Sequence, residues 1–294
     1  MSDIPESDRT YRFEAIGTTW QIDVDSPLQD QVKDEIARLI DSYDCAFSRF
    51  RPESTVSQAQ KAAGRYHFMA YADELFQLYA RLYELTNGMF TPLVGQILED
   101  LGYDADYSLV RHATPHSPPA WPDVATYSSG ELITSQPLVI DVGAAGKGHL
   151  VDLVCSYLAA SGYQSYCVDA GGDIRTQDLH GKPQRIGLEH PDNTNLVIGT
   201  IDVVNQSICA SATNRRRWGA QLHHVINPHT AHPTTSISAT WVISDRAMVA
   251  DALATCLFLV DPEVLGAEYD FEFLRIGGDN RLEKSQHFNA TLFS

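Results

Sequence analysis

Hydrophobic and polar residues along this chain follow two repeating patterns, which predict separate strands and helices. Residues 11–24 alternate between the two kinds, which predicts strand structure with a break at a glycine. Apolar residues recur at helical spacing over 28–47 and again over 71–87, where an Asn-Gly pair ends the second predicted helix. The first third of the chain therefore combines strands and helices.

The middle of the chain is centred on a glycine-rich turn. We expect an apolar strand over 137–142, a helix over 147–161 and a second strand over 164–169. Residues 104–137 hold several prolines, serines and threonines, which predicts an irregular surface excursion rather than a linker between domains.

The last third of the chain predicts more strands around one helix. Short apolar segments over 184–210 are typical of a meander, and residues 237–243 predict a further strand. A helix capped by Ser244 or Asp245 is expected to run to about residue 260, with a hairpin after it. The chain of residues 1–294 shows no internal repeat, and its mixture of strands and helices predicts the α+β class; its length allows one large domain or two closely packed ones.

Composition narrows the classes of function. The 294 residues carry a formal net charge of −17, which disfavours nonspecific binding to nucleic acid or to anionic membranes. No apolar run approaches the roughly 20 residues of a membrane helix, so no membrane insertion is expected. The 5 cysteines are scattered, which predicts buried, reduced thiols. The acidic N-terminus has no secretory or lipoprotein signal, so we expect a cytoplasmic protein.

The segment DVGAAGKGHLVD, residues 141–152, is a candidate anion site. A glycine-rich turn that opens a helix presents backbone N–H groups to a phosphate, and Lys147 adds a positive charge. The glycine spacing fits neither the P-loop nor the dinucleotide-binding fingerprint. A turn that only reverses the chain is the alternative interpretation.

Two further segments offer oxygen ligands. Asp251 and Thr255 are four residues apart, so one helix face carries both, and their oxygens suit Mg²⁺. A solvated aspartate beside a hydrogen-bonded threonine is the alternative. Asp173 follows a glycine pair, where it either contacts a ligand or fixes a tight turn.

Histidines and arginines concentrate in two neighbouring segments. One segment holds His223, His224, His229 and His232, and one of these four is a candidate general base. The adjacent pair, His223 and His224, would point to opposite faces in a strand. A strand followed by an Asn-Pro turn is the simpler interpretation. The three arginines at 215–217 form either a solvated loop or a contact with a phosphate or an acidic partner.

Six segments, in order, resemble recurrent blocks of the ApbE-type FAD:protein FMN transferases. They are FSRFRPEST, TNGMFTPLVG, DVGAAGKGHLVD, VDAGGDIR, HHVINPHTAHP and ADALAT, within about residues 12–260. The resemblance implies a single-domain, T-fold-like flavin transferase fold of the α+β class. It also implies transfer of FMN from FAD to a Ser or Thr hydroxyl of a target protein, with release of AMP. The implied cofactor is Mg²⁺, with Mn²⁺ as an alternative, and the implied partners are FAD and a flavin-acceptor protein.

The resemblance also implies roles for individual residues. Asp251, Thr255 and the backbone carbonyl of Ala144 match the metal ligands. Phe50 stands where the family often stacks an aromatic ring on the flavin. His224 is our candidate base for the target hydroxyl, with Asp173 as the second choice. The other positions that match FAD contacts are Ile16, Met89, Phe90, Thr91, Asp141, Lys147 and Val225.

The chain departs from the family pattern at three blocks. Thr91 stands where the family commonly has Asp, Asn227 and Ala231 stand where it has Asp and Gly, and Ala-Ser-Ala-Thr at 210–213 replaces Ala-Thr-Ser-Gly. Each change removes a carboxylate, a hydroxyl or a flexible glycine. Two alternatives therefore stay open: an FAD-binding protein without transferase activity, and a Mg²⁺-dependent FAD pyrophosphatase that makes FMN and AMP.

Overall fold

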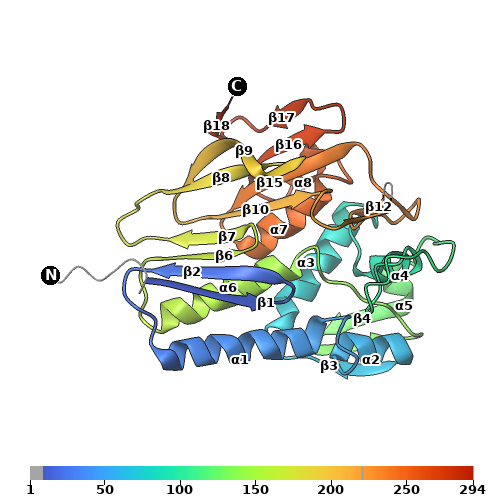
Figure 1. The fold of residues 1–294 in the computed structure, drawn as a ribbon. Helices are drawn as coiled ribbons and strands as arrows, with labels where there is room; N and C mark the ends of the chain where they lie inside the picture. Colours follow the sequence, from blue (N-terminus) through green and yellow to red (C-terminus); the bar gives the residue numbers. More distant parts are fainter. Residues whose placement is uncertain (1–8, 220–221, 294) are drawn as a thin grey trace.

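The structure is a computed structural model that describes residues 9–219 and 222–293 (Figure 1). Residues 1–8, which contain much of the acidic N-terminus, and Gln221, which opens the histidine-rich segment, lie outside the described residues. Within the described part, no helix is long and apolar enough to cross a bilayer. All five cysteines are free, as expected, although Cys45 and Cys167 are only partly buried.

An antiparallel eight-stranded sheet organises the fold. Its strand order is β1-β2-β6-β7-β10-β15-β16-β17. In β15, Trp241 and Val242 belong to different buried clusters, because successive side chains point to opposite faces of a strand. The sheet therefore separates two cores. Its strands are Thr10–Ala15, Thr18–Val24, Tyr166–Ala170, Asp173–Gln177, Ser207–Ala212, Ile237–Ser244, Glu272–Gly277 and Leu282–Lys284.

Two helices, α6 (Gly146–Ala160) and α7 (Ala247–Cys256), cover one face of the main sheet, and α1 (Asp30–Phe47) packs against α6 (Figure 1). Helices α6 and α7 approach closely at Gly148, where an added Cβ would lie 2.2 Å from the carbonyl oxygen of Ala247. Only glycine fits there.

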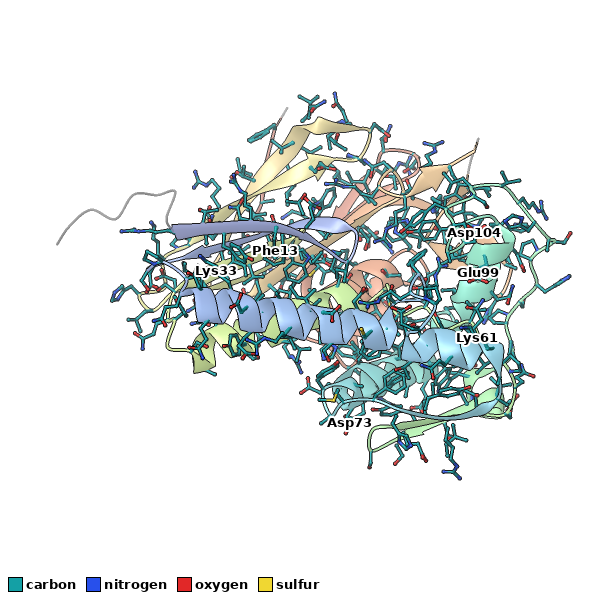
Figure 2. All side chains as sticks on the ribbon, turned by 60° about the horizontal axis from the view of Figure 1, so that its bottom comes forward. Phe13, Lys33, Lys61, Asp73, Glu99 and Asp104 are labelled. Carbon is teal, nitrogen blue, oxygen red and sulfur yellow. The ribbon has the colours of Figure 1, made fainter. Side chains whose placement is uncertain are left out.

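A smaller layer lies beyond α1. Asp73, at the start of α3, accepts hydrogen bonds from the Tyr127 hydroxyl and the Gly130 N–H, which ties the β4–β5 hairpin to that helix. Figure 2 shows Asp73 in this layer, with Lys33 on α1 and Lys61 on α2. The elements are α2 (Thr55–Lys61), β3 (Gly64–His67), α3 (Ala72–Leu85), η2 (Pro92–Val94), α4 (Gly95–Asp100), α5 (Trp121–Val124), β4 (Ala125–Ser128) and β5 (Glu131–Thr134).

A three-stranded sheet, in the order β18-β9-β8, covers the other face of the main sheet. Phe288 lies fully buried between the two sheets, with Leu188 and Leu274. The remaining elements are β8 (Gln184–His190), β9 (Asn193–Val203), β11 (Arg217–Trp218), β12 (Leu222–His223), β13 (Ile226–Asn227), β14 (His232–Pro233), α8 (Pro262–Gly266) and β18 (Thr291–Leu292).

Three expectations about the elements were wrong. Residues 137–142 are not a strand; they run through the core and donate isolated hydrogen bonds, from Leu138 N–H to Ala59 and from Asp141 N–H to Pro92. The excursion over 104–137 ends in α5, β4 and β5. Helix α7 follows Arg246, without a side-chain cap, and ends at Cys256 rather than near residue 260.

Candidate flavin-transfer site

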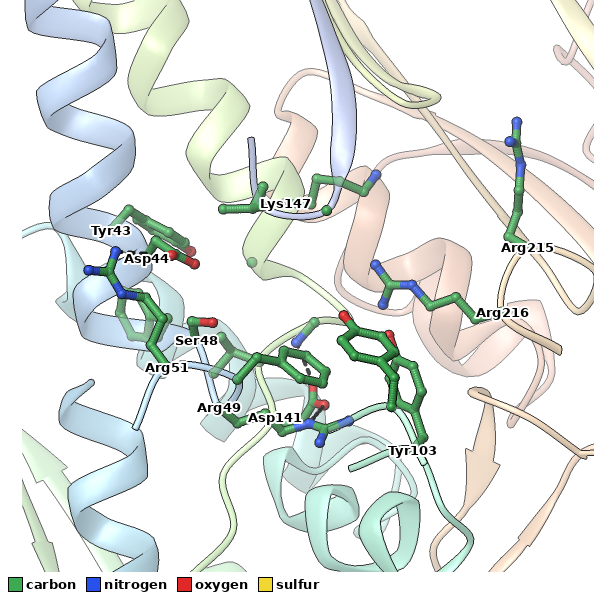
Figure 3. Close-up of a pocket in the computed structure, with 18 of the residues that line it drawn as sticks. Tyr43, Asp44, Ser48, Arg49, Arg51, Tyr103, Asp141, Lys147, Arg215 and Arg216 are labelled. Carbon is green, nitrogen blue, oxygen red and sulfur yellow. Dashed lines mark hydrogen bonds and ion pairs between the residues drawn. The ribbon is translucent and has the colours of Figure 1, made fainter. Parts of the chain in front are cut away.

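Two cavities adjoin where the glycine-rich turn meets the main sheet, and Figure 3 shows the larger one. Their volumes are about 660 Å³ and about 250 Å³. We treat them as one site because they share seven lining residues. These residues are Gly17, Tyr103, Asp141, Gly143, Lys147, Arg215 and Arg216.

All of the site residues expected from the sequence line these cavities except Asp173. Ile16 and Phe50 line the larger cavity, and Asp141 and Lys147 line both. The smaller cavity holds Met89, Phe90, Thr91, Ala144, His224, Val225, Asp251 and Thr255. The fold thus brings together residues that are up to 239 positions apart in the chain, from Ile16 to Thr255.

Helix α7 supplies the acidic end of the site. The Asp251 side chain is buried, and its Oδ2 accepts a hydrogen bond of 2.9 Å from the Gly148 N–H. Burial, followed by repulsion from Asp173, raises the pKa of Asp251 to about 7, although Lys147 opposes the shift. The alternative of a solvated aspartate on this helix was therefore wrong.

Lys147 on α6 forms an ion pair with Asp173, which is fully buried behind it at the start of β7. Burial opposes the charge on Lys147, but Asp173 and Asp251 outweigh it and raise the pKa of Lys147. One lysine therefore faces two carboxylates. Among the described residues, Asp173 Oδ1 is buried without a hydrogen-bond partner.

The acidic end fits a hard divalent cation. It offers oxygen donors from Asp251, Thr255 and the Ala144 backbone, and an unpaired carboxylate oxygen lies buried behind them. Such cations prefer oxygen ligands, and their charge would balance the second carboxylate. The described residues contain no group of three or more His, Cys, Asp or Glu side chains that could hold a metal, so this donor set depends on a hydroxyl and a backbone carbonyl.

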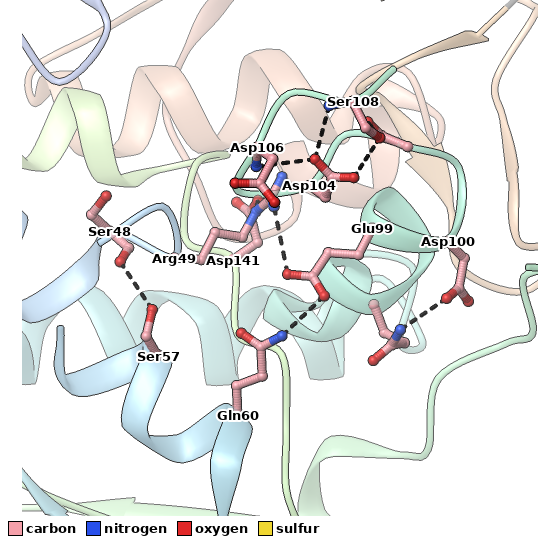
Figure 4. A network of polar contacts seen from close by, with 12 residues as sticks. Ser48, Arg49, Ser57, Gln60, Glu99, Asp100, Asp104, Asp106, Ser108 and Asp141 are labelled. Carbon is pink, nitrogen blue, oxygen red and sulfur yellow. Dashed lines mark hydrogen bonds and ion pairs between the residues drawn. The ribbon is translucent and has the colours of Figure 1, made fainter. Parts of the chain in front are cut away.

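Arg49, which the sequence analysis did not single out, lies buried between two carboxylates (Figure 4). Its Nε donates to Asp141 Oδ2 at 2.7 Å, and its Nη1 lies 3.9 Å from Glu99 Oε1. Burial opposes the charge on Asp141, but Arg49 outweighs it and lowers the pKa of that carboxyl. Asp141 Oδ1 accepts the Gly143 N–H at 2.7 Å, so the pair fixes the glycine turn.

Aromatic rings line the larger cavity. The guanidinium carbon of Arg49 lies 4.2 Å from the centre of the Phe50 ring and 5.0 Å from that of Tyr103. Tyr103 in turn stacks on Trp218, with the ring centres 5.5 Å apart. Tyr107 was missed because it lies in the excursion, whose pattern predicted no structure, and Tyr103 directly precedes that segment.

Of the two adjacent histidines, His223 has a structural role and His224 lines the site. This agrees with the expectation that their side chains point in opposite directions. His223 is buried, and its Nε2 lies 2.7 Å from the Thr234 carbonyl oxygen. His224 lines the smaller cavity, and its Nδ1 is buried without a hydrogen-bond partner among the described residues. Burial, followed by Arg216, lowers the pKa of His224 to about 3, so the imidazole is neutral.

Two of the three departing blocks keep their local turns. Asn227 Oδ1 accepts the His229 and Thr230 N–H groups, as an aspartate oxygen would. The Thr91 hydroxyl accepts the Leu93 N–H and starts η2. Ala231, with φ +56°, adopts the left-handed conformation for which the family uses glycine.

The ApbE family model matches residues 16–269. An FAD:protein FMN transferase of Vibrio cholerae is 27% identical over 257 residues, which cover 78% of this chain and 73% of that protein. One from Rhodobacter capsulatus is 28% identical over 191 residues, 60% of this chain but only 36% of that protein.

Solved structures support the same fold. The ApbE protein of Thermotoga maritima superposes with a TM-score of 0.82 at 22% identity, covering 95% of this chain and 97% of that one. Flavin Transferase ApbE from Vibrio cholerae does so with a TM-score of 0.75 at 22% identity and the same coverage. The expected α+β flavin transferase fold is therefore confirmed.

Proposed function

This chain belongs to the ApbE family, and from that membership we propose that it transfers FMN from FAD to a Ser or Thr hydroxyl of an acceptor protein and releases AMP. One observation carries the proposal. A single continuous site places the Phe50 ring in the larger cavity, Asp251 and Thr255 in the smaller one, and Lys147 in both. A flavin, its pyrophosphate and a cation need these three environments in that order.

We assign Mg²⁺, or Mn²⁺ in its place, to Asp251, Thr255 and the Ala144 carbonyl. When bound, the ion neutralises charge on the pyrophosphate and makes its phosphorus more electrophilic. Asp173 contributes from behind, because its ion pair keeps Lys147 charged and aimed at the site. Lys147 then binds a phosphate oxygen, and the N–H groups at the start of α6 add their dipole.

In the proposed reaction, the acceptor hydroxyl oxygen bonds to the phosphorus of the FMN half of FAD. The bond from that phosphorus to the AMP oxygen breaks, and the hydroxyl proton passes to a base. His224 suits this role better than Asp173, because its neutral ring lines the cavity and its Nδ1 has no hydrogen-bond partner among the described residues, whereas Asp173 is fully buried and paired. The low pKa of His224 rises when an anionic pyrophosphate binds beside it.

Catalysis in this scheme comes mostly from position and charge. Phosphoryl transfer requires little covalent chemistry from the protein, so orientation of the pyrophosphate and stabilisation of its charge account for most of the rate. Although the chain has a net charge of −17, this site is lined by three positively charged side chains, Lys147, Arg215 and Arg216.

The direct test incubates the purified protein with FAD and Mg²⁺, with and without candidate acceptor proteins. Chromatography measures AMP and FMN, and in-gel fluorescence measures covalent flavin. Fluorescent acceptor with an equal amount of AMP is the expected result. FMN and AMP without acceptor would instead identify a pyrophosphatase, and FAD that stays intact and bound with every acceptor would identify a binding protein.

A further inference from the structure

The Phe50 ring, on which the proposed flavin stacks, has two groups stacked on it already. The Arg49 guanidinium carbon lies 4.2 Å from the ring centre, and the Tyr107 ring lies nearly parallel, at 13°, with centres 5.1 Å apart. Both groups lie within stacking distance of the ring, so a flavin that stacks on Phe50 competes with at least one of them.

The two groups differ in how firmly they are held. The Arg49 side chain is 2% exposed and forms an ion pair with Asp141. Moving Arg49 off the Phe50 ring would break that pair and leave the Asp141 carboxylate without its counter-charge. Tyr107 is 53% exposed, and its remaining ring contact is edge-on to Tyr103. A ligand that needs a face of Phe50 therefore displaces Tyr107.

The backbone at Tyr107 is strained. Tyr107 has φ +50° and Leu109 has φ +53°, a conformation that is costly for residues with a side chain. The loop around them is held by Asp104, whose Oδ1 accepts the N–H groups of Asp106 and Ser108 at 3.1 and 2.9 Å. Strain of this kind collects at functional sites, where a second conformation relieves it.

We propose that Tyr107 is a specificity-determining plug, whose ring occupies the flavin position in the free protein and competes with the flavin for Phe50. This inference rests on the proposed function, because it takes the ligand to be FAD. When the Tyr107 ring covers Phe50, the molecule cannot bind a flavin. The apparent affinity for flavin is therefore the intrinsic affinity multiplied by the fraction of molecules in which Phe50 is uncovered. The plug lowers affinity only for ligands that place an aromatic ring on Phe50.

The test compares Tyr107→Ala with Tyr107→Phe, which keeps the ring. Stopped-flow fluorescence measures association of FAD and of FMN, and calorimetry measures binding of ADP, which lacks the flavin. We expect Tyr107→Ala to bind FAD and FMN about threefold to tenfold more tightly, mainly through faster association, as loss of one competing aromatic pair allows. Tyr107→Phe and every ADP affinity should match the wild type.

Three results would overturn the inference. Unchanged flavin binding by Tyr107→Ala, or an equal change for ADP, would refute the plug while the proposed function stands. Weaker flavin binding by Tyr107→Ala would mean that Tyr107 holds the bound flavin instead of competing with it. A wild-type protein that binds no flavin would refute the proposed function and the plug together.

Discussion

At the scale of single residues, the site is built from buried charges that lack full compensation. Asp251 is the clearest case. Its pKa is raised to about 7, so the folded protein favours the protonated form, and the stabilising proton is lost as the pH rises through 7. Above that pH the ligand-free fold carries an unfavourable carboxylate, which agrees with the cation site that we propose for Asp251.

We therefore predict that Asp251→Asn stabilises the metal-free protein at pH 8. The gain in free energy of unfolding should be roughly 2–4 kcal/mol at pH 8 and should vanish as the pH falls below the ordinary aspartate pKa of about 3.9, where Asp251 is protonated in both states. Denaturant titrations in EDTA measure it, with the exposed Asp202→Asn as control. The same substitution should abolish flavin transfer. A less stable Asp251→Asn at pH 8 would contradict the charge argument.

Arg49 gives a second prediction at this scale. Because Arg49→Ala leaves the partly buried Asp141 carboxylate without its counter-charge, it should lower the free energy of unfolding by about 1–3 kcal/mol. Adding Asp141→Asn removes the unpaired charge, so the double variant should be more stable than Arg49→Ala alone. Thermal melts of the single and double variants test this. Equal losses in both would mean that Arg49 acts through packing on Phe50 rather than through charge.

The sequence analysis found some of these residues and missed others for a physical reason. Asp251, Thr255 and Lys147 lie within short motifs whose spacing is itself informative. Arg49 acquires its role only from Asp141, 92 residues away, and no local period signals that pair. Tyr107 belongs to a segment without any pattern.

At the scale of elements, the two-residue turn between β1 and β2 affects both the stability of the fold and the lining of the proposed binding site. Ile16 has φ +43° beside Gly17 at +76°, although a β-branched residue strongly disfavours this conformation. The turn is therefore under strain where its side chain reaches the larger cavity.

We predict that Ile16→Asn raises the free energy of unfolding by about 0.5–1 kcal/mol and weakens FAD binding, because Asn-Gly suits this turn but offers no apolar contact. Ile16→Ala is the control: it removes the contact but keeps the strain, so it should weaken binding without gain in stability. Unchanged FAD affinity in both variants would exclude Ile16 from the site.

The crossing of α6 and α7 gives another prediction. In Gly148→Ala the new Cβ would lie 2.2 Å from the Ala247 carbonyl oxygen and 2.7 Å from Asp251 Cβ. We expect a loss of about 1–3 kcal/mol in stability from overpacking, together with loss of FMN transfer as Asp251 shifts. Gly266→Ala, in α8 and with no atom within 4 Å of the added Cβ, is the control and should fold and react normally.

Local sequence patterns predict some of the helices and strands and miss others. Helices α1, α3 and α6 and strands β1, β2 and β15 follow local periods and were predicted within a few residues. Residues 137–142 have the apolar character of a strand, but their N–H groups bond to Ala59 and Pro92, which the local pattern cannot reveal. Strand β5 pairs with β4 in a hairpin and also with β3, whose partner residues lie more than 60 positions earlier, so no local period reveals this sheet.

At the scale of the whole molecule, two cores share one sheet. One core joins the helices to the main sheet and surrounds the site, and the other joins the main sheet to β8, β9 and β18. The second core includes residues beyond 269, where the family match ends. Because β15 and β16 contribute side chains to both, neither core can come apart without exposing the other.

We therefore predict that residues 9–293 unfold as one cooperative domain. Phe288→Ala removes a fully buried ring from the second core, so it should lower the free energy of unfolding by about 3–5 kcal/mol. Calorimetry should show one transition at a lower temperature, and FAD affinity below that transition should be unchanged, since Phe288 lies on the far side of the sheet from the site. Phe293→Ala, in the same terminal segment but 55% exposed, should leave the transition in place. Two transitions, of which only one responds to Phe288→Ala, would divide the chain into two domains.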